Sequence, residues 1–477
     1  MSGTAKLSAK DRIYTLLDEN SFVEIGALVT KRNTDFNLTQ TEAPSDGVIT
    51  GYGVIEGNLV YVYSQNAAVL NGTMGEMHAK KIANLYTMAL KVGAPVIGLV
   101  DCAGLRLQEA TDALAGFGEV YLKQTMASGV IPQITAVFGT CGGGSAVSAA
   151  LSDFTFMPKE NAKLFVNAPN TLSGNYIEKC NTASAAFQAA TGMVDVVEED
   201  EADVLESIRM LVALLPSNNE DNASSECADD LNRLTSAFEA EAADPVVALA
   251  DLADDNFFYE VREAYAKEMV TGFLRLNGMT VGAVANRTAV FDENGKAAEK
   301  YDAVLTTAGC KKAEKFVSFC DAFGIPVLTL TNVAGYATTV AEEGSVAAAA
   351  AKLTYTFANA TVPKVNVITE KAMGSAYITM NSKHIGADMV FALEGAKVGM
   401  MDAELAAQIM YAGEKSEVQK EKATEYAKLQ GSAEAAAARG YIDNIISAPA
   451  VRKHLIYAFE MLYTKRENRP AKKHGTV

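Results

Sequence analysis

Short apolar runs alternate with amphipathic stretches along the first part of the chain. The runs 95–100 (PVIGLV) and 134–138 (ITAVF) are continuous, which is typical of strands that are covered on both faces. Residues 49–66 predict two strands joined by a tight turn at Glu56-Gly57-Asn58. Residues 77–93 predict a helix, because their larger apolar residues recur at helical spacing. That stripe comprises Ile82, Leu85, Leu90 and Val92.

The second half of the chain repeats this pattern. Residues 94–106 (APVIGLVDCAGLR) align with 325–337 (IPVLTLTNVAGYA), and 131–144 (IPQITAVFGTCGGG) align with 362–375 (VPKVNVITEKAMGS). The offset is identical in both cases, and the preceding amphipathic stretches align at the same offset. Alternating strands and helices predict an α/β fold. We therefore predict two tandem β-β-α units that arose by internal duplication.

The first strands of the two copies align at a shorter offset. Residues 49–66 resemble residues 270–287. An insertion in the second copy, near 292–301 (DENGKAAEKY), accounts for the difference between the two offsets.

A polar segment separates the two copies. Residues 216–245 are acidic and carry only scattered apolar residues, so we predict an interdomain linker with one surface helix. The predicted domains are then residues 1–215 and residues 246–477.

Composition excludes several classes of protein. A net charge of −17 argues against non-specific binding to nucleic acid, which needs a basic surface. The six cysteines form no C-x-x-C pair or disulfide framework and are expected to be reduced thiols. No run of 18 apolar residues occurs, and the first residues lack the apolar core of a signal peptide. We therefore expect a cytoplasmic protein.

Each copy contains two glycine turns at the same spacing, Gly104 with Gly143 and Gly335 with Gly374. Each turn follows a predicted buried strand and precedes a helix, so their backbone N–H groups are expected to converge. Two N–H groups directed at one point form an oxyanion hole. The glycines fit neither a P-loop nor a dinucleotide-binding fingerprint. A purely structural role, close packing of helix on strand, is the remaining alternative.

Few side chains are available for chemistry. The four histidines are too scattered for a metal site, and Ser145 stands in no G-x-S-x-G motif. Asp101 and Glu109 flank Gly104 and have two open roles: acid–base catalysis, or capping and orienting the segment that carries Arg106. A site built from backbone dipoles suits enolate chemistry on a thioester, where the charge on oxygen must be stabilised.

These segments resemble the carboxyltransferase subunits of biotin-dependent acyl-CoA carboxylases, of the propionyl-CoA carboxylase β-subunit type. They also resemble the α-subunits of sodium-pumping acyl-CoA decarboxylases. The resemblance covers nearly the whole chain. It is carried by LSAKDRIYTLLDENSFVEI (7–25), DGVITGYG (46–53), GAPVIGLVDCAGLRLQEATDALAGFGEV (93–120), ASGVIPQ (127–133), SDFTFM (152–157), LLPSNN (214–219), ATVPKVNVITEKAMGSAY (360–377), NSKHIGAD (381–388) and RPAKKHG (469–475).

The resemblance implies that each half adopts the ClpP/crotonase spiral fold, and it assigns the site residues. Ile378 corresponds to a wall of the substrate pocket. The acyl-CoA thioester would be bound by Gly104, Leu105, Gly143 and Gly144. Biotin would be bound by Gly335, Tyr336, Gly374, Ser375 and Ala376. The catalytic N–H donors of the two holes would be Gly143, Gly144, Ser375 and Ala376, and no metal is implied.

The resemblance further implies the reaction and its partners. A carboxyl group would move between carboxybiotin and an acyl-CoA, through an enolate held by two backbone oxyanion holes and without a side-chain base. No M-K-M biotinylation sequence occurs, so biotin would be carried by a separate protein. The chain would form a hexamer with active sites at the dimer interface. A biotin carboxylase or a membrane decarboxylase subunit would be the further partner.

Some residues depart from the family pattern, and these departures leave alternatives open. Ser375 stands where the family has glycine, so its Cβ would be strained if φ were positive. Residues 175–188 lack the family's histidine and glycines. A non-catalytic paralogue that assembles with an active carboxyltransferase is therefore one alternative. A biotin-independent crotonase-like CoA enzyme, with Glu109 as its carboxylate, is the other. The basic tail 465–477 is either solvated or a contact across the dimer.

Overall fold

The computed structural model describes residues 6–33, 41–173 and 180–470. The first residues of the departing segment 175–188 and the last residues of the basic tail 465–477 therefore lie outside the described residues.

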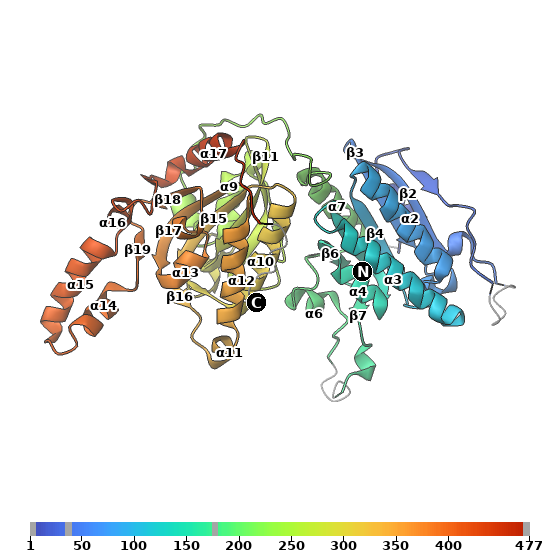
Figure 1. Cartoon of the computed structure of the whole chain (residues 1–477), viewed down its shortest axis with the longest axis horizontal. Coiled ribbons are helices and arrows are strands. Elements are labelled where there is room, and N and C mark those ends of the chain that lie inside the picture. The colour runs from blue at the N-terminus through green and yellow to red at the C-terminus, as the bar shows by residue number, and fades with distance from the viewer. Residues whose placement is uncertain (1–5, 34–40, 174–179, 471–477) are drawn as a thin grey trace. The chain divides into compact units, whose positions relative to one another are not determined.

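The chain divides into two compact units, Met1–Asn222 and Ala223–Val477 (Figure 1). The boundary falls inside the polar segment 216–245. Within that segment the Asn218 side chain donates to the Gly93 carbonyl oxygen of the first unit, at 2.8 Å. The short helix α8 (Phe238–Glu241) lies in this segment at the surface: Glu239 and Ala240 are exposed, while Phe238 is fully buried in the core of the second unit.

The first unit is built on one mixed eight-stranded sheet. Its first three strands are antiparallel and the remaining ones are parallel. The sheet order is β1 (Val23–Ile25), β2 (Val48–Ile55), β3 (Asn58–Gln65), β4 (Val96–Cys102), β5 (Gln133–Gly142), β6 (Phe154–Pro158) and β8 (Val196–Glu198), with β7 (Lys163–Phe165) beside β5. The α-helices among its described residues are α1 (Ala9–Leu16), α2 (Glu76–Val92), α3 (Ala110–Ala127), α4 (Gly144–Ala150), α6 (Ala185–Ala190) and α7 (Glu201–Leu214).

The second unit repeats this topology. Its sheet order is β9 (Phe258–Val261), β10 (Met269–Leu276), β11 (Met279–Asn286), β15 (Val327–Val333), β17 (Lys364–Met373), β18 (Met389–Leu393) and β20 (Asn444–Ile446), with β19 (Lys397–Gly399) beside β17. Its longer helices are α9 (Pro245–Leu252), α10 (Thr307–Ala322), α12 (Val346–Asn359), α14 (Ala403–Met410), α15 (Ser416–Gln430) and α17 (Val451–Leu462). Its short helices are α11 (Val340–Glu343), α13 (Gly374–Thr379) and α16 (Ala433–Ala437).

The duplication extends to local irregularities. Strands β4 and β15, predicted as buried on both faces, have every residue buried. Each carries a register irregularity at the same place, between Val100 and Cys102 and between Thr331 and Val333. The predicted turn between β2 and β3 forms with positive φ at Glu56 and Gly57, which matches the twist of the strands.

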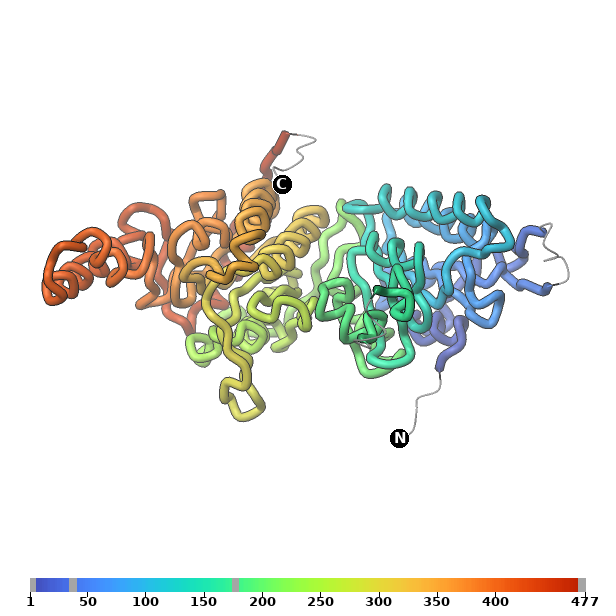
Figure 2. Tube along the Cα trace, turned by 90° about the horizontal axis from the view of Figure 1, so that it is seen from below, coloured from blue at the N-terminus to red at the C-terminus, as the bar shows by residue number. Residues whose placement is uncertain are grey.

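The inserted segment is a hairpin. Strands β12 (Ala289–Phe291) and β13 (Ala297–Lys300) pair antiparallel, and the hairpin projects from the second unit as the yellow loop in Figure 2. The helical stripe of α2 is largely as predicted, since Ile82 and Leu85 are buried. The prediction is wrong for Val92, whose side chain is 55% exposed. The helix ends at this residue, and Gly93 turns the chain in a left-handed conformation.

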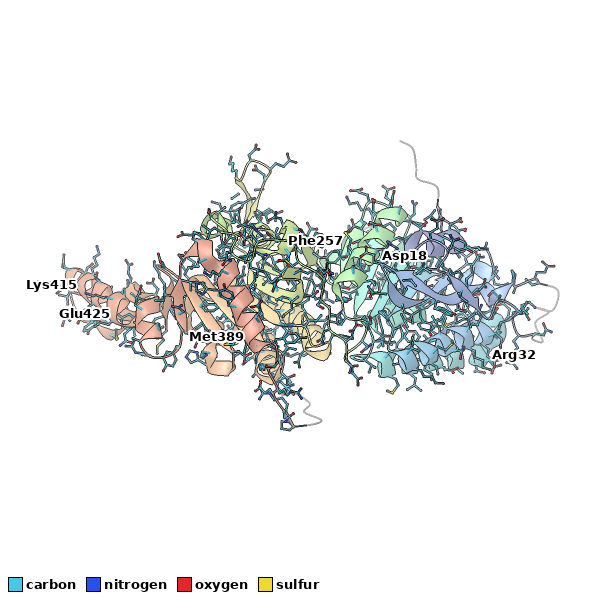
Figure 3. The ribbon with its side chains drawn as sticks, turned by 90° about the horizontal axis from the view of Figure 1, so that it is seen from above. Asp18, Arg32, Phe257, Met389, Lys415 and Glu425 are labelled. Atoms are coloured by element: carbon cyan, nitrogen blue, oxygen red, sulfur yellow. The ribbon has the colours of Figure 1, made fainter. Side chains whose placement is uncertain are left out.

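Two peripheral features complete the second unit. Helices α14 and α15 form an arm, and Lys415, in the turn between them, lies at its tip (Figures 1 and 3). The tail packs on its own unit as far as it is described. Lys465 pairs with Asp388 at 2.8 Å, and Arg469 donates to the Ala358 carbonyl oxygen at the end of α12. Across the described ranges, none of the helices is long and apolar enough to cross a membrane.

Candidate active site

In the first unit the two predicted glycine turns lie next to each other. Strands β4 and β5 are parallel neighbours, and Cys102 is in register with Cys141 immediately before the turns. Gly104 has φ +117° and Gly143 has φ +58°, so both turns use conformations that favour glycine. A Cβ on Gly104 would lie 3.5 Å from the carbonyl oxygen of Gly142, so the two backbones are in close contact.

The structure distinguishes the N–H groups of these turns. The N–H of Gly143 donates to the carbonyl oxygen of Phe165 on β7, at 3.0 Å. The expectation that Gly143 offers a free N–H is therefore wrong, because β7 extends the sheet beside β5 and takes this donor. Gly144 begins helix α4, where N–H groups are unpaired. Among the described residues, the N–H groups of Gly144, Gly104 and Leu105 have no hydrogen-bond partner.

The second unit presents its counterpart at helix α13. Val333 and Ala372 are in register before the turns, as Cys102 and Cys141 are. The left-handed residue is Gly374, with φ +62°, and Ser375 follows it in the first turn of the helix. Ser375 has no positive φ, so its Cβ carries no backbone strain. Within the described part of the chain, the N–H groups of Ser375 and Ala376 have no partner.

The glycine turn at Gly335 in the second unit differs from the corresponding turn at Gly104 in the first. Gly335 and Tyr336 form the short strand β16 (Gly335–Tyr336), which pairs in parallel with β14 (Val304–Leu305). Gly335 does not have a positive φ, unlike Gly104, because strand pairing keeps this segment extended. The hydroxyl of Tyr336 lies 3.5 Å from the hydroxyl of Thr379, which connects the turn to α13.

A pocket of about 410 Å³ borders α13. Ile378, the predicted pocket residue, is 36% exposed and lines it together with Ser375. The rings of His384 and Tyr441 stack at 4.8 Å in its wall. The hydroxyl of Tyr377 is buried there, has no partner among the described residues, and burial raises its pKa to about 12. The pocket is largely apolar.

The carboxylates beside Gly104 orient the local structure. Asp101 accepts a hydrogen bond from the N–H of Thr140 on β5, at 3.1 Å, and pairs with Lys6 at 2.8 Å. Glu109 pairs with Arg106 at 2.8 Å, and its other oxygen accepts the N–H of Glu76 at the start of α2, at 2.6 Å. Of the two roles open from the sequence, the contacts favour capping and orientation, because both carboxylates are fully engaged.

Two buried partners of this cluster were not found from the sequence. Asp46 pairs with Arg106 at 2.6 Å and accepts the N–H of His78 at 2.8 Å. The His78 ring lies between the Asp46 carbonyl oxygen, at 2.9 Å, and the Gln65 side chain, at 3.1 Å. No motif spacing relates these positions; only the fold brings them together.

His78 should make the fold sensitive to acid. Burial, reinforced by the charge of Arg106, lowers the pKa of His78 from its usual value of 6.5 to about 3. The unfolded chain therefore binds the extra proton between pH 6.5 and pH 3 while the folded chain does not, so stability falls as pH drops through that window. We expect the unfolding temperature of His78→Gln to depend less on pH between 7 and 4 than that of the wild type. Equal slopes in thermal melts would contradict this assignment.

A second prediction concerns Ala110, the first residue of α3. Its φ of +47° and ψ of −120° nearly equal those of Gly143, at +58° and −121°. L residues rarely adopt this region, and Ala110 is exposed, so its methyl group adds no packing that offsets the strain. We expect Ala110→Gly to stabilise the protein by about 1 kcal/mol. An unfolding temperature that is unchanged or lower in Ala110→Gly would show that the residue is unstrained.

The mixed sheet with its flanking helices, present in two copies, defines a duplicated crotonase-type fold. Comparison with known proteins then gives the family: the carboxyl transferase domain matches residues 3–477. The propionyl-CoA carboxylase beta chain of Roseobacter denitrificans is 38% identical over 496 residues, which cover 100% of this chain and 94% of that one. Methylmalonyl-CoA decarboxylase subunit alpha of Propionigenium modestum is 37% identical over 499 residues, which cover 99% and 93%. The chain belongs to the carboxyl transferase family.

A solved structure agrees with this assignment. Transcarboxylase 12S, described as a hexamer with hydrolysed methylmalonyl-coenzyme A bound, matches with a TM-score of 0.91 and 34% sequence identity. The match covers 99% of this chain and 92% of that one. The predicted crotonase-type duplication is thereby confirmed.

Proposed function

We propose that this chain transfers a carboxyl group between biotin, held by a separate carrier protein, and an acyl-CoA. The observation that carries the proposal is the pair of helix starts α4 and α13, where N–H groups that follow a left-handed glycine have no partner within the described ranges. Such groups stabilise negative charge on oxygen, because they are preorganised and need no reorientation during the reaction. The two copies therefore provide one such site for each substrate.

On the acyl side, Gly144 with Gly104 and Leu105 would bind the thioester carbonyl oxygen. These three residues have the unpaired N–H groups, whereas Gly143 contributes the turn that places Gly144. As the bond between the carboxyl group and the α-carbon forms or breaks, negative charge collects on that oxygen. Donors already in place would hold it. In the carboxylation direction the α-proton would pass to the biotin nitrogen that gives up the carboxyl group, so a side-chain base is not needed.

On the biotin side, the residues at α13 fit a neutral cyclic urea. Ser375 is exposed, its N–H and that of Ala376 are unpaired, and the neighbouring pocket is apolar. Gly335 and Tyr336 would form the second edge of this site. Biotin supplies the nitrogen that carries the carboxyl group; Ser375 and Ala376 would bind its carbonyl oxygen and orient it. Ile378 would limit the group that enters beside it, favouring a small or apolar acyl group.

The two alternatives are less well supported. Glu109 is fully buried and bound to Arg106 and the start of α2, so it is a poor acid–base group for a biotin-independent enzyme. The substitution at Ser375, which suggested an inactive paralogue, leaves the N–H in place without strain. The family's assemblies lead us to propose a homo-hexamer that works with a biotin carrier. Its further partner would be a biotin carboxylase or a membrane decarboxylase subunit.

Decarboxylation in the presence of free biotin tests the proposal. Purified protein is incubated with malonyl-CoA or methylmalonyl-CoA, with and without biotin, and release of the decarboxylated thioester is followed. We expect turnover that depends on biotin. Turnover that is the same without biotin would favour the biotin-independent enzyme. Absence of turnover, with the CoA ester still bound, would favour the non-catalytic subunit.

A further inference from the structure

The first unit contains a buried ionic cluster directly after the acyl-side turn. Arg106 follows Gly104 and Leu105 and is 1% exposed. Its guanidinium contacts two carboxylates, Asp46 at 2.6 Å and Glu109 at 2.8 Å. Its other terminal nitrogen donates to the carbonyl oxygen of Thr73 at 2.8 Å. A guanidinium bound on several sides loses its freedom to move, and the backbone that bears it is fixed accordingly.

The same cluster holds the turn through its backbone. Met74 donates its N–H to the carbonyl oxygen of Gly104 at 2.9 Å, and the N–H of Arg106 donates to the carbonyl oxygen of Met74 at 3.0 Å. Gly75, the next residue, is packed so closely against Arg106 and Glu109 that a Cβ there would overlap both side chains. The backbone of Gly104 and Leu105 is thus held by hydrogen bonds through its carbonyl side, while the N–H groups of both residues have no partner in the part of the chain that the structure describes.

The second unit provides an internal comparison. Glu342 accepts the N–H of Thr307 at the start of α10, at 2.6 Å, as Glu109 accepts that of Glu76 at the start of α2. Thr307 aligns with Glu76 at the offset of the repeat, whereas Val340 aligns with Glu109, so the second unit forms an equivalent cap with a carboxylate two positions further along. The ion pair has no counterpart there, because Ala337 occupies the position of Arg106; among the residues described, Glu342 forms no ion pair. Capping a helix therefore does not require the arginine.

We infer that Arg106 and Glu109 are positioning residues, whose ion pair fixes the N–H groups of Gly104 and Leu105 for the acyl-CoA carbonyl oxygen. Asp46 supports the pair by accepting from the same terminal nitrogen of the guanidinium that Glu109 binds. The inference rests on the proposed carboxyl transfer. Displacing a backbone donor by a fraction of an ångström weakens its bond to the developing charge more than it weakens ground-state binding. Loosening the ion pair therefore lowers kcat more than it lowers the affinity for the CoA ester.

Glu109→Gln and Glu342→Gln form a matched pair that tests the inference. Both substitutions weaken a helix cap, but only the first removes an anionic partner of Arg106. In biotin-dependent decarboxylation, we expect Glu109→Gln to lower kcat by about 10- to 100-fold, the range for a misplaced donor. The KM for free biotin and the Kd of the CoA ester, measured by calorimetry, should change by less than about threefold. Glu342→Gln should lower kcat by less than about threefold.

Asp46→Asn keeps the test decisive if Glu109→Gln does not fold. It retains the size of the side chain and removes a carboxylate charge from Arg106. Its amide oxygen can still accept the N–H of His78 in the first turn of α2, and the Glu109 cap on the N–H of Glu76 stays in place. It should lower kcat in the same direction, and the double variant with Glu109→Gln should lose less than the product of the single effects, because both act through one guanidinium. If Glu109→Gln or Asp46→Asn folds and keeps the wild-type kcat, the inference is overturned. The same holds if either variant loses no more kcat than Glu342→Gln does. Both outcomes leave the proposed function standing. A wild-type protein without biotin-dependent turnover would overturn the proposed function, and the inference with it.

Discussion

Replacing Ser375 with proline should lower biotin-dependent turnover by about 10²–10³-fold while the protein remains folded. Proline lacks the N–H group, and the first turn of a helix tolerates it because the N–H groups there make no helical hydrogen bond. Ser375 meets these conditions: it is exposed, follows the left-handed Gly374, and has an N–H without a partner among the described residues. The substitution therefore removes one backbone donor and little else.

Ser375→Ala is the matched control. It removes the hydroxyl group and keeps the N–H, so its turnover should stay within about threefold of wild type. Circular dichroism and the unfolding temperature show whether both variants are folded. If Ser375→Pro were as active as Ser375→Ala, the N–H of Ser375 would have no part in the reaction. If both were equally impaired, the hydroxyl group would be the functional group.

Gly143→Ala should lower stability and turnover together. A Cβ at this position meets no atom within 4 Å, so its cost is conformational and not steric. At φ +58° and ψ −121° we expect a loss of about 1–3 kcal/mol in the free energy of unfolding. Relief of that strain rotates the peptide that precedes Gly144. The unpaired N–H at the start of α4 then moves, and turnover should fall by at least about 10-fold.

Gly324→Ala separates the two effects. Gly324 also has a left-handed φ, +67°, and open space for a Cβ, but it lies between α10 and the start of β15, at the opposite end of that strand from the Gly335 turn. The Gly324→Ala variant should therefore have a lower free energy of unfolding and the same turnover as the wild type. Gly143→Ala introduces strain in this backbone conformation and Ala110→Gly removes it. The two substitutions should therefore change the free energy of unfolding in opposite directions. A Gly143→Ala variant of normal activity would assign this turn a purely structural role.

The repeat was the most informative feature of the sequence. Its constant offset predicted which strands are equivalent, and their register partners, Cys102 with Cys141 and Val333 with Ala372, agree. This works because a strand buried on both faces must be apolar throughout, and apolar runs are visible in a sequence. The glycines of the turns were visible for a similar reason, since positive φ at Gly143 and Gly374 restricts the residue type.

The roles of single donors could not be predicted in the same way. Gly143 and Gly144 look alike in the sequence, yet the N–H of Gly143 is taken by Phe165 and that of Gly144 is not. The acceptor is a backbone carbonyl oxygen, which every residue has, so no residue type marks it. Glu109 is a comparable case, because a carboxylate near a glycine turn fits a catalytic role and a capping role equally well until its partners are known.

The sequence by itself determined the duplication, the α/β order of each copy and the glycine turns at the strand ends, because these depend on hydrophobic periodicity and on φ. Only the tertiary structure decided which N–H groups remain unpaired, that Ser375 lies outside the strained position, and that Asp46 and Glu109 meet at Arg106. Those facts depend on contacts between segments far apart in the chain. Hydrogen bonds and ion pairs of this kind are set by distance and direction, which residue order does not encode locally.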